Sequence, residues 1–212
     1  MNQLQGIRSL PRSSPNRAYR TGLVRLVLLV WIALVTAGFS ALVVYERYPG
    51  TDGGPTLKAE STLHRETWTL LVAVHPRCPC TQATVDELES LLRRYPADVV
   101  CHAMVYHPPG LEKVWLELSL VEQLRALPRV TLSGDSDGRK LAALGMETSG
   151  AVRLIDPAGK VRFYGGITAS RGHRGFNAGS QIIESLLRGK AITLDHAPVY
   201  GCRMRPAPKE IQ

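Results

Sequence analysis

The sequence predicts an α/β domain preceded by one N-terminal transmembrane helix. Residues 26–45 contain no charged side chain and are almost all apolar. A helix of that length rises about 30 Å, which is the thickness of the hydrocarbon core of a membrane. Beyond residue 61, short apolar runs alternate with amphipathic runs of helical period, a pattern typical of a central sheet flanked by helices.

The basic excess of the chain is concentrated ahead of the apolar run. The chain has a formal net charge of +8, and its first 25 residues contain no acidic residue. They carry five arginines, Arg8, Arg12, Arg17, Arg20 and Arg25. The positive-inside rule therefore predicts a cytoplasmic tail over residues 1–25 and an extracytoplasmic, periplasmic location for everything after the span, at a bacterial inner membrane. A cleaved signal peptide is the alternative, and it leaves the folded part on the same side.

The rest of the chain divides by composition. Residues 46–61 are rich in glycine and proline, and we predict that they form a flexible stalk. We expect the folded domain over residues 62–190 and a C-terminal tail over residues 191–212. The body has no basic stripe with interleaved aromatic residues, so nucleic acid is not an expected partner.

Within the domain, the expected order of elements is β-α-β-α-(β-α)-β-β-α. The predicted strands cover residues 68–74, 99–106, a short run near 130, 151–156 and 160–164, and the predicted helices cover 81–95, 111–127, 139–144 and 180–188. Asp156-Pro157-Ala158-Gly159 is a turn sequence, so the last two strands are expected to form a hairpin. Asp135-x-Asp137-Gly138 is also predicted to be a turn, because a calcium loop would need a glutamate that is missing.

The sequence Cys78-Pro79-Cys80 lies between a buried strand and the start of an amphipathic helix. Backbone N–H groups at a helix N-terminus stabilise a thiolate and lower its pKa, and Arg77 adds a neighbouring positive charge. A thiolate with a low pKa attacks disulfides or binds soft metals. A disulfide across one intervening residue would close a small, strained ring, and strained bridges are more oxidising.

The run from Leu70 to Thr81 resembles the active-site strand and helix start of the thioredoxin superfamily, most closely its membrane-anchored bacterial members of RedB type. Residues 145–164 are similar to the hairpin region of that family. The resemblance implies a thioredoxin-like fold and thiol–disulfide exchange with Cys78 and Cys80 as the catalytic pair. Cys78 is expected to be the more exposed of the two.

The chain departs from the family pattern in two places. The family has two residues between its cysteines and this chain has one, so an alignment on Pro79-Cys80 puts Arg77 where the family has its first cysteine. Gly150, preceded by Thr148 and Ser149, stands where the family normally has a cis-proline. That replacement argues against an ordinary reductase, and it removes a group that would crowd a metal near the thiolates.

The glycine-rich stretch 165–179 joins the last strand to the last helix and is expected beside the cysteines. Its His173 is a candidate acid–base group or nitrogen ligand. The supporting or substrate-binding candidates are Arg77, Thr81, Ser149, Gly150, Thr168, Ser170, Arg171, His173 and Asn177. The alternative is a solvated loop whose arginines only keep it soluble.

Two functional hypotheses lead. The first is a membrane-tethered thiol–disulfide redox protein that exchanges electrons with protein thiols or a membrane donor and needs no cofactor. The second is a copper metallochaperone with Cys78, Cys80 and His173 as ligands, since thiolates and imidazole suit Cu(I). Whether the chain is an enzyme stays open, and peroxide reduction or structural docking ranks below both.

Cys101 is expected to be buried, while Cys202 is a third redox thiol, a ligand or a bystander.

Overall fold

The computed structural model describes residues 15–54 and 67–204, which divide into one unit up to Tyr45 and a second unit from Glu46 onward. Nearly all of helix α1 (Pro15–Arg47) belongs to the first unit. Its residues Tyr19–Arg47 are the one stretch, within the described ranges, long and apolar enough to cross a membrane, and an 18-residue segment of it has a mean hydropathy of 2.6. By length and composition this helix is a membrane anchor or a signal sequence.

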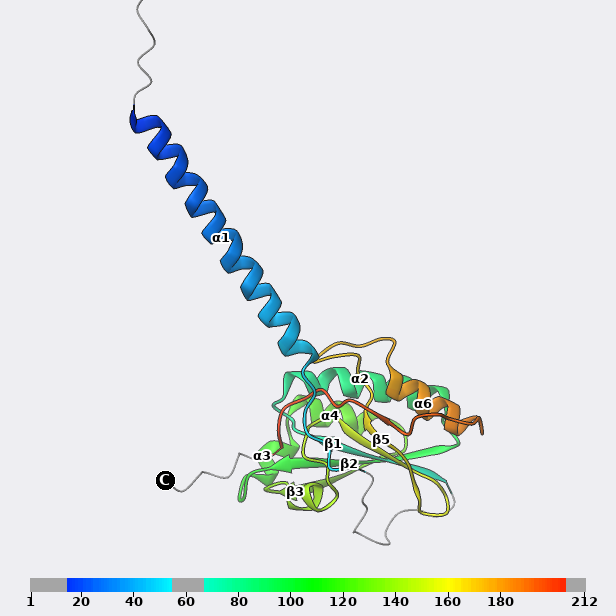
Figure 1. Ribbon diagram of the computed structural model, residues 1–212. Helices are drawn as coiled ribbons and strands as arrows, with labels where there is room; N and C mark the ends of the chain where they lie inside the picture. Colours follow the sequence, from blue (N-terminus) through cyan, green and yellow to red (C-terminus); the bar gives the residue numbers. More distant parts are fainter. Residues whose placement is uncertain (1–14, 55–66, 205–212) are drawn as a thin grey trace, which may run out of the picture. The chain divides into compact units, whose positions relative to one another are not determined.

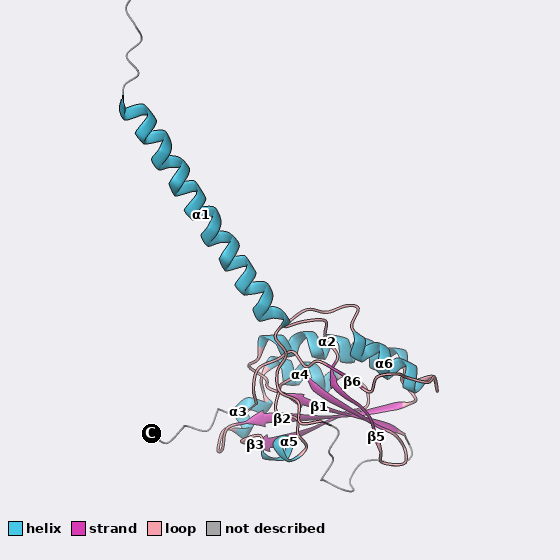
Figure 2. Ribbon diagram, in the orientation of Figure 1, coloured by secondary structure: helices cyan, strands magenta, loops and turns pink. Residues whose placement is uncertain are grey.

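The second unit is built on a mixed sheet. Its described strands lie in the order β3-β2-β1-β4-β5-β6, and Figure 2 shows them in magenta. They are β1 (Trp68–Val74), β2 (Val99–His107), β3 (Val130–Ser136), β4 (Ala151–Ile155), β5 (Val161–Gly166) and β6 (His196–Ala197). Strands β1, β2 and β3 are parallel to one another, while β4 runs antiparallel to β1 and to β5. The predicted parallel start and closing hairpin are therefore confirmed.

Helices cover both faces of the sheet because successive strand side chains point to opposite faces. Helices α2 (Pro79–Arg94), α4 (Ser119–Ala126) and α6 (Ala178–Leu187) lie together on one face, as Figure 1 shows. They pack on a buried cluster that takes Leu70 and Val72 from β1. Helices α3 (Glu112–Leu116) and α5 (Arg139–Ala143) contribute to the second cluster, which takes Leu71 and Ala73 from the same strand.

The prediction of one helix over residues 111–127 is wrong, because α3 and α4 are separate. Leu118, between them, is extended, with ψ at 146°. Trp115 of α3 belongs to the second buried cluster, whereas Val121 and Leu124 of α4 belong to the first. One straight helix would not reach both faces of the sheet, so the chain has to break where the apolar side changes.

The Asp135–Gly138 segment is a turn, as predicted. Asp137 and Gly138 have φ values of 59° and 61°. The carboxylate of Asp135 accepts hydrogen bonds from the backbone N–H groups of Lys140 and Leu141, at 3.0 and 2.8 Å. The acidic side chain therefore satisfies the start of α5.

The prediction of a flexible stalk is wrong for residues 50–53, which pack on the folded unit. The Gly50 N–H donates to the Val199 carbonyl at 2.7 Å, and the Gly53 N–H donates to the Gly145 carbonyl at 2.8 Å. Asp52 forms an ion pair with Arg153. The glycine-rich composition suggested flexibility. At Gly53, however, the absence of a side chain lets the backbone contact Gly145, because a Cβ would lie 2.8 Å from Gly145 Cα. Residues 55–61 lie outside the described ranges.

Residues 191–204 are also part of the fold and not a tail. Strand β6 pairs with β5, and Val199 and Met204 are buried in the second cluster. The apolar residues of this segment are isolated among glycine, proline and polar residues, so they show no helical or strand period in the sequence. The final eight residues, 205–212, fall outside the described part.

Candidate thiol site

Cys78 lies where β1 gives way to α2, as the sequence predicted. Cys78 is the N-cap residue, and Pro79 and Cys80 are the first two residues of α2. Proline suits the first helical position because the N–H that it lacks would have no partner inside the helix. The Cys78 N–H donates to the His75 carbonyl at 2.9 Å, and the Thr81 N–H donates to the Cys78 carbonyl at 3.0 Å. The backbone around the first cysteine is therefore held on both sides.

The exposure of the two cysteines is the reverse of that predicted. The Cys78 side chain is only 2% exposed, whereas Cys80 is half-buried. Neither apolar cluster of the core includes Cys78. Its sulfur instead lies 2.8 Å from the sulfur of Cys202, within hydrogen-bonding distance. Contact with the C-terminal segment that carries Cys202 therefore helps to bury it.

Cys202 is the site residue that sequence reasoning did not assign. It lies 124 residues from Cys78 in the chain, and no motif surrounds it. The Ser149 N–H donates to the Cys202 carbonyl, and the Met204 N–H donates to the Glu147 carbonyl, both at 2.8 Å. This antiparallel pairing brings the third thiol to the site. The one feature of the sequence that could have indicated its role is a single cysteine near the C-terminus of a chain that also carries the close pair Cys78 and Cys80.

The three thiols differ in their pKa values. Burial opposes ionisation of Cys78, but hydrogen bonds from the Cys202 and Thr81 side chains and from the Cys202 and Cys80 backbone outweigh it, so the pKa of Cys78 is lowered. Burial and the neighbouring Cys78 raise the pKa of Cys80, against the opposite effect of Arg171. Burial and the hydrogen bond to Cys78 raise the pKa of Cys202 to about 12. Cys78 is therefore the thiol that ionises first.

The positive charge at the site comes from Arg171 and not from Arg77. The Arg77 guanidinium lies over the Trp115 ring, 4.8 Å from its centroid. With burial, which is the larger effect, the charge of Arg77 lowers the pKa of His75. Arg171 lowers the pKa values of Cys80 and Cys202, and its Nη1 donates to the Gly201 carbonyl at 2.6 Å. The loop arginine thus supports both the thiols and the segment that carries Cys202.

Ser149, Thr81 and Gly150 form the floor of the site. The Ser149 hydroxyl accepts from the His75 N–H at 2.8 Å and shares a hydrogen bond of 2.6 Å with the Thr81 hydroxyl. The described residues contain no cis peptide bond, and Gly150 has φ at +87°. A Cβ at Gly150 would lie 2.7 Å from the Thr84 hydroxyl oxygen. Backbone angle and close packing against Thr84 therefore explain this glycine.

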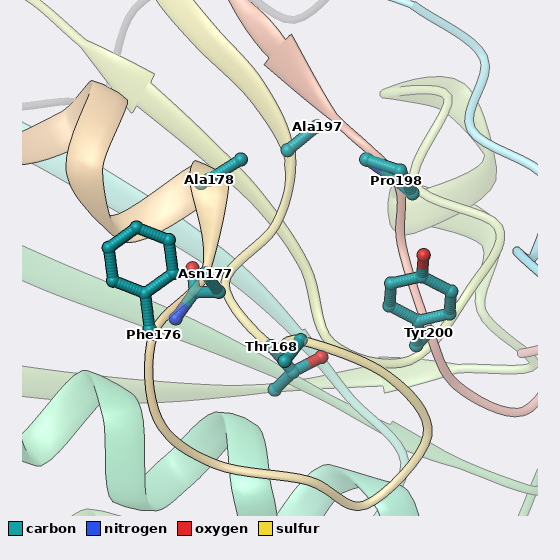
Figure 3. A pocket seen from close by; sticks show the side chains of 9 residues that line it. Thr168, Phe176, Asn177, Ala178, Ala197, Pro198 and Tyr200 are labelled. Atoms are coloured by element: carbon teal, nitrogen blue, oxygen red, sulfur yellow. The ribbon is translucent and has the colours of Figure 1, made fainter. Parts of the chain in front are cut away.

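The remaining loop candidates make other contacts. The exposed His173 ring makes contacts of 3.0 Å with the Ser170 hydroxyl and 2.8 Å with the Arg171 carbonyl, within its own loop. Asn177 is the N-cap of α6, where its side-chain oxygen accepts from the Ser180 N–H at 2.7 Å. Thr168 and Asn177 line an open pocket of about 260 Å³, and Figure 3 shows Phe176 and Tyr200 on opposite sides of it.

The copper hypothesis is not favoured by this arrangement. In the part of the chain that the structure describes, no group of three or more His, Cys, Asp and Glu side chains is arranged to hold a metal ion. His173 makes its described contacts within its own loop. The fourth cysteine, Cys101, is buried in the first apolar cluster, as predicted, and burial raises its pKa to about 12.

Two solved structures are similar in fold to most of this chain. No family model matches the chain, and no curated protein matches its sequence. An uncharacterized conserved protein of Geobacillus kaustophilus is similar in structure, with a TM-score of 0.54 and 17% identity over 77% of this chain and 92% of that one. A hypothetical protein of Sinorhizobium meliloti has a TM-score of 0.54 and 15% identity over 76% and 96% of the two chains.

A thioredoxin-like protein solved in its oxidized form has a TM-score of 0.44 and 18% identity, over 69% of this chain and 97% of that one. By the order and direction of its strands, the chain has a thioredoxin-like fold. Its parallel β1–α2–β2 start, antiparallel β4–β5 hairpin and closing helix α6 are the arrangement that the resemblance implied. Because one fold serves many functions, the chemistry has to be argued from the three thiols.

Proposed function

We propose that the chain is a membrane-tethered thiol–disulfide redox protein that acts outside the cytoplasm through Cys78 and a neighbouring thiol, which the sequence predicted to be Cys80. One observation carries the proposal. Cys78 caps helix α2, its pKa is lowered, and Cys202 lies 2.8 Å away, sulfur to sulfur. A thiolate is the attacking species in disulfide exchange, and a neighbouring thiol is what releases the mixed disulfide. The substrates are disulfides or thiols of client proteins.

The pKa order of the thiols supports exchange chemistry over a structural role. A structural cysteine in an apolar core has a raised pKa and stays protonated, as Cys101 does. The Cys78 side chain is also buried, yet hydrogen bonds at the helix start and from the C-terminal segment lower its pKa. A buried ionisable side chain whose pKa nevertheless favours the charged form is typical of functional sites.

The proposed location rests on helix α1 and the residues before it. The described part of the chain has one helix of membrane-spanning length and hydropathy. The arginines in residues 1–25 favour a cytoplasmic N-terminus, so residues after the span lie outside, where disulfides persist. Intact cells treated with a membrane-impermeant maleimide test this topology. Modification of Cys80 only after the cells are lysed would contradict it.

The redox function is tested by titrating the full chain, in detergent, through glutathione buffers of graded potential. Free thiols are counted by maleimide labelling and mass spectrometry. We expect dithiothreitol-reversible loss of two thiols, and we expect Cys78→Ser to abolish it. The matched control is Cys101→Ser, which removes the buried core cysteine and should leave the titration unchanged. Thiols that stay fully reduced at every potential would refute the function.

A further inference from the structure

Cys202 is held at Cys78 by its backbone on both sides. Its carbonyl accepts from the Ser149 N–H, and two residues later the Met204 N–H donates to Glu147, each at 2.8 Å. The Met204 side chain is 2% exposed and belongs to the second apolar cluster. The segment is therefore anchored by backbone pairing and by burial of its last described side chain.

The residue before Cys202 has to be a glycine. A Cβ at Gly201 would lie 1.9 Å from the Ser149 carbonyl oxygen, a distance that no side chain can adopt. The Gly201 carbonyl also accepts from Nη1 of Arg171 at 2.6 Å. The chain thus approaches Ser149 as closely as a backbone can, and this approach sets the Cys202 sulfur against Cys78.

The two sulfurs are paired in the manner that disulfide formation needs. They lie 2.8 Å apart, and a disulfide bond joins sulfurs at about 2.05 Å. Their hydrogen bond stabilises Cys78 as the thiolate and keeps Cys202 as the protonated partner. By contrast, a bridge between Cys78 and Cys80 would close a small ring across Pro79 at the first turn of α2.

We propose that Cys202 is the resolving cysteine of this site, so that the oxidised protein carries a Cys78–Cys202 disulfide. The inference rests on the proposed function and replaces Cys80 as the partner of Cys78. Cys80, which is half-buried and not part of this bond, keeps its thiol. The C-terminal segment is then both the cover of Cys78 and the source of the second electron-donating thiol.

The exchange balances in two steps. With residues 201–203 lifted from Ser149, the Cys78 thiolate attacks one sulfur of a client disulfide, the client S–S bond breaks, and the released client thiolate takes up a proton. The segment returns, Cys202 loses its proton and attacks the Cys78 sulfur of the mixed disulfide. The bond to the client breaks and its second thiolate is protonated. The client disulfide gains two electrons, and Cys78 and Cys202 lose two.

Tryptic mapping of the oxidised full chain tests the inference directly. Cleavage after Arg77 and Arg93 gives one peptide that contains both Cys78 and Cys80, and cleavage after Lys190 and Arg203 gives another that contains Cys202. The chain is oxidised with glutathione disulfide, blocked with maleimide, digested without reductant and analysed by mass spectrometry. We expect the two peptides to be linked by a disulfide that dithiothreitol releases.

Single variants assign the bond. The link should persist in Cys80→Ser and in the matched control Cys101→Ser, and it should be lost in Cys78→Ser and in Cys202→Ser. A disulfide confined to the peptide of residues 78–93, or a link lost in Cys80→Ser, would overturn the inference and leave the proposed function intact. Complete absence of any disulfide at all potentials would overturn both.

Discussion

The carboxylate of Asp52 is paired with the guanidinium of Arg153, a side chain that is fully buried at the centre of the sheet. Nη1 of Arg153 donates to Asp52 Oδ2 at 3.0 Å, and its guanidinium also lies over the Tyr164 ring at 5.6 Å. Asp52 follows α1 by five residues, whereas Arg153 is the middle residue of β4. The pair therefore fixes the segment after α1 onto the folded unit.

Asp52→Ala should strongly destabilise the folded unit, because it leaves the buried charge of Arg153 without its counter-ion. Loss of one partner of a buried pair typically costs about 3–5 kcal/mol. The measurement is urea unfolding of the full chain in detergent, followed by tryptophan fluorescence. The matched control is Glu122→Ala, which breaks the exposed pair with Arg125 and should cost at most about 1 kcal/mol. Equal effects of the two variants would mean that the Asp52 pair does not anchor the segment.

Cys202→Ala should move the ionisation of Cys78 to higher pH. The hydrogen bond from the Cys202 side chain is the leading effect that lowers the pKa of Cys78 against burial, and alanine cannot donate it. Cys202→Ser keeps a donor and should retain most of the shift. The measurement is the rate of Cys78 alkylation by iodoacetamide as a function of pH, in a chain that also carries Cys80→Ser and Cys101→Ser.

The same shift contributes to the pH dependence of stability. Because the folded pKa of Cys78 lies below its unfolded value, the ionised thiol stabilises the fold fully above the unfolded pKa. That stabilisation is lost as the pH falls through the folded pKa. If the rate of Cys78 alkylation depends on pH in the same way in Cys202→Ala and in the parent chain, the 2.8 Å contact between the two sulfurs does not control ionisation of Cys78.

Gly201→Ala should make Cys78 react faster with iodoacetamide at a fixed pH. The added Cβ would meet the Ser149 carbonyl oxygen at 1.9 Å, so the segment that covers Cys78 has to move away. The same variant should lower the yield of the bond between Cys78 and Cys202. Gly38→Ala is the control, since Gly38, like Gly201, has no positive φ, but a Cβ there would meet nothing within 4 Å. A rate for Cys78 that matches this control would contradict the covering role.

Local patterns in the sequence predicted most of the fold. The apolar run at Trp68–Val74, the amphipathic period of α2 and the turn before β5 depend on neighbours in the chain, and all three elements are present. The junction that carries Cys78 followed from the first two. The break between α3 and α4 was missed, because Trp115 and Val121 are spaced as in one continuous helix. Their side chains nevertheless pack in the two different apolar clusters.

The missed features depend on contacts between residues far apart in the chain. Cys202 pairs with Cys78 and Asp52 pairs with Arg153, and none of the four is marked by a local motif for its partner. Cys78 was expected to be exposed because position alone says nothing of the segment that covers it. The sequence predicted a thiol site at the right junction, but a backbone approach at Gly201 decides which thiol faces Cys78.

Ser149→Ala should destabilise the site by removing the only side-chain oxygen described as accepting from the His75 N–H and pairing with the Thr81 hydroxyl. Both Ser149 and Thr81 are buried, so an unmet hydrogen bond there costs about 1–3 kcal/mol per group. Thr81→Val removes the opposite hydroxyl with little change of shape. Adding it to Ser149→Ala should therefore cost less than the two single losses combined, since the bond between the two hydroxyls is lost in each single variant but only once in the double variant. Urea unfolding of the parent, both single variants and the double variant gives the coupling. Strictly additive losses would mean that the 2.6 Å contact between the two hydroxyls does not stabilise the floor of the thiol site.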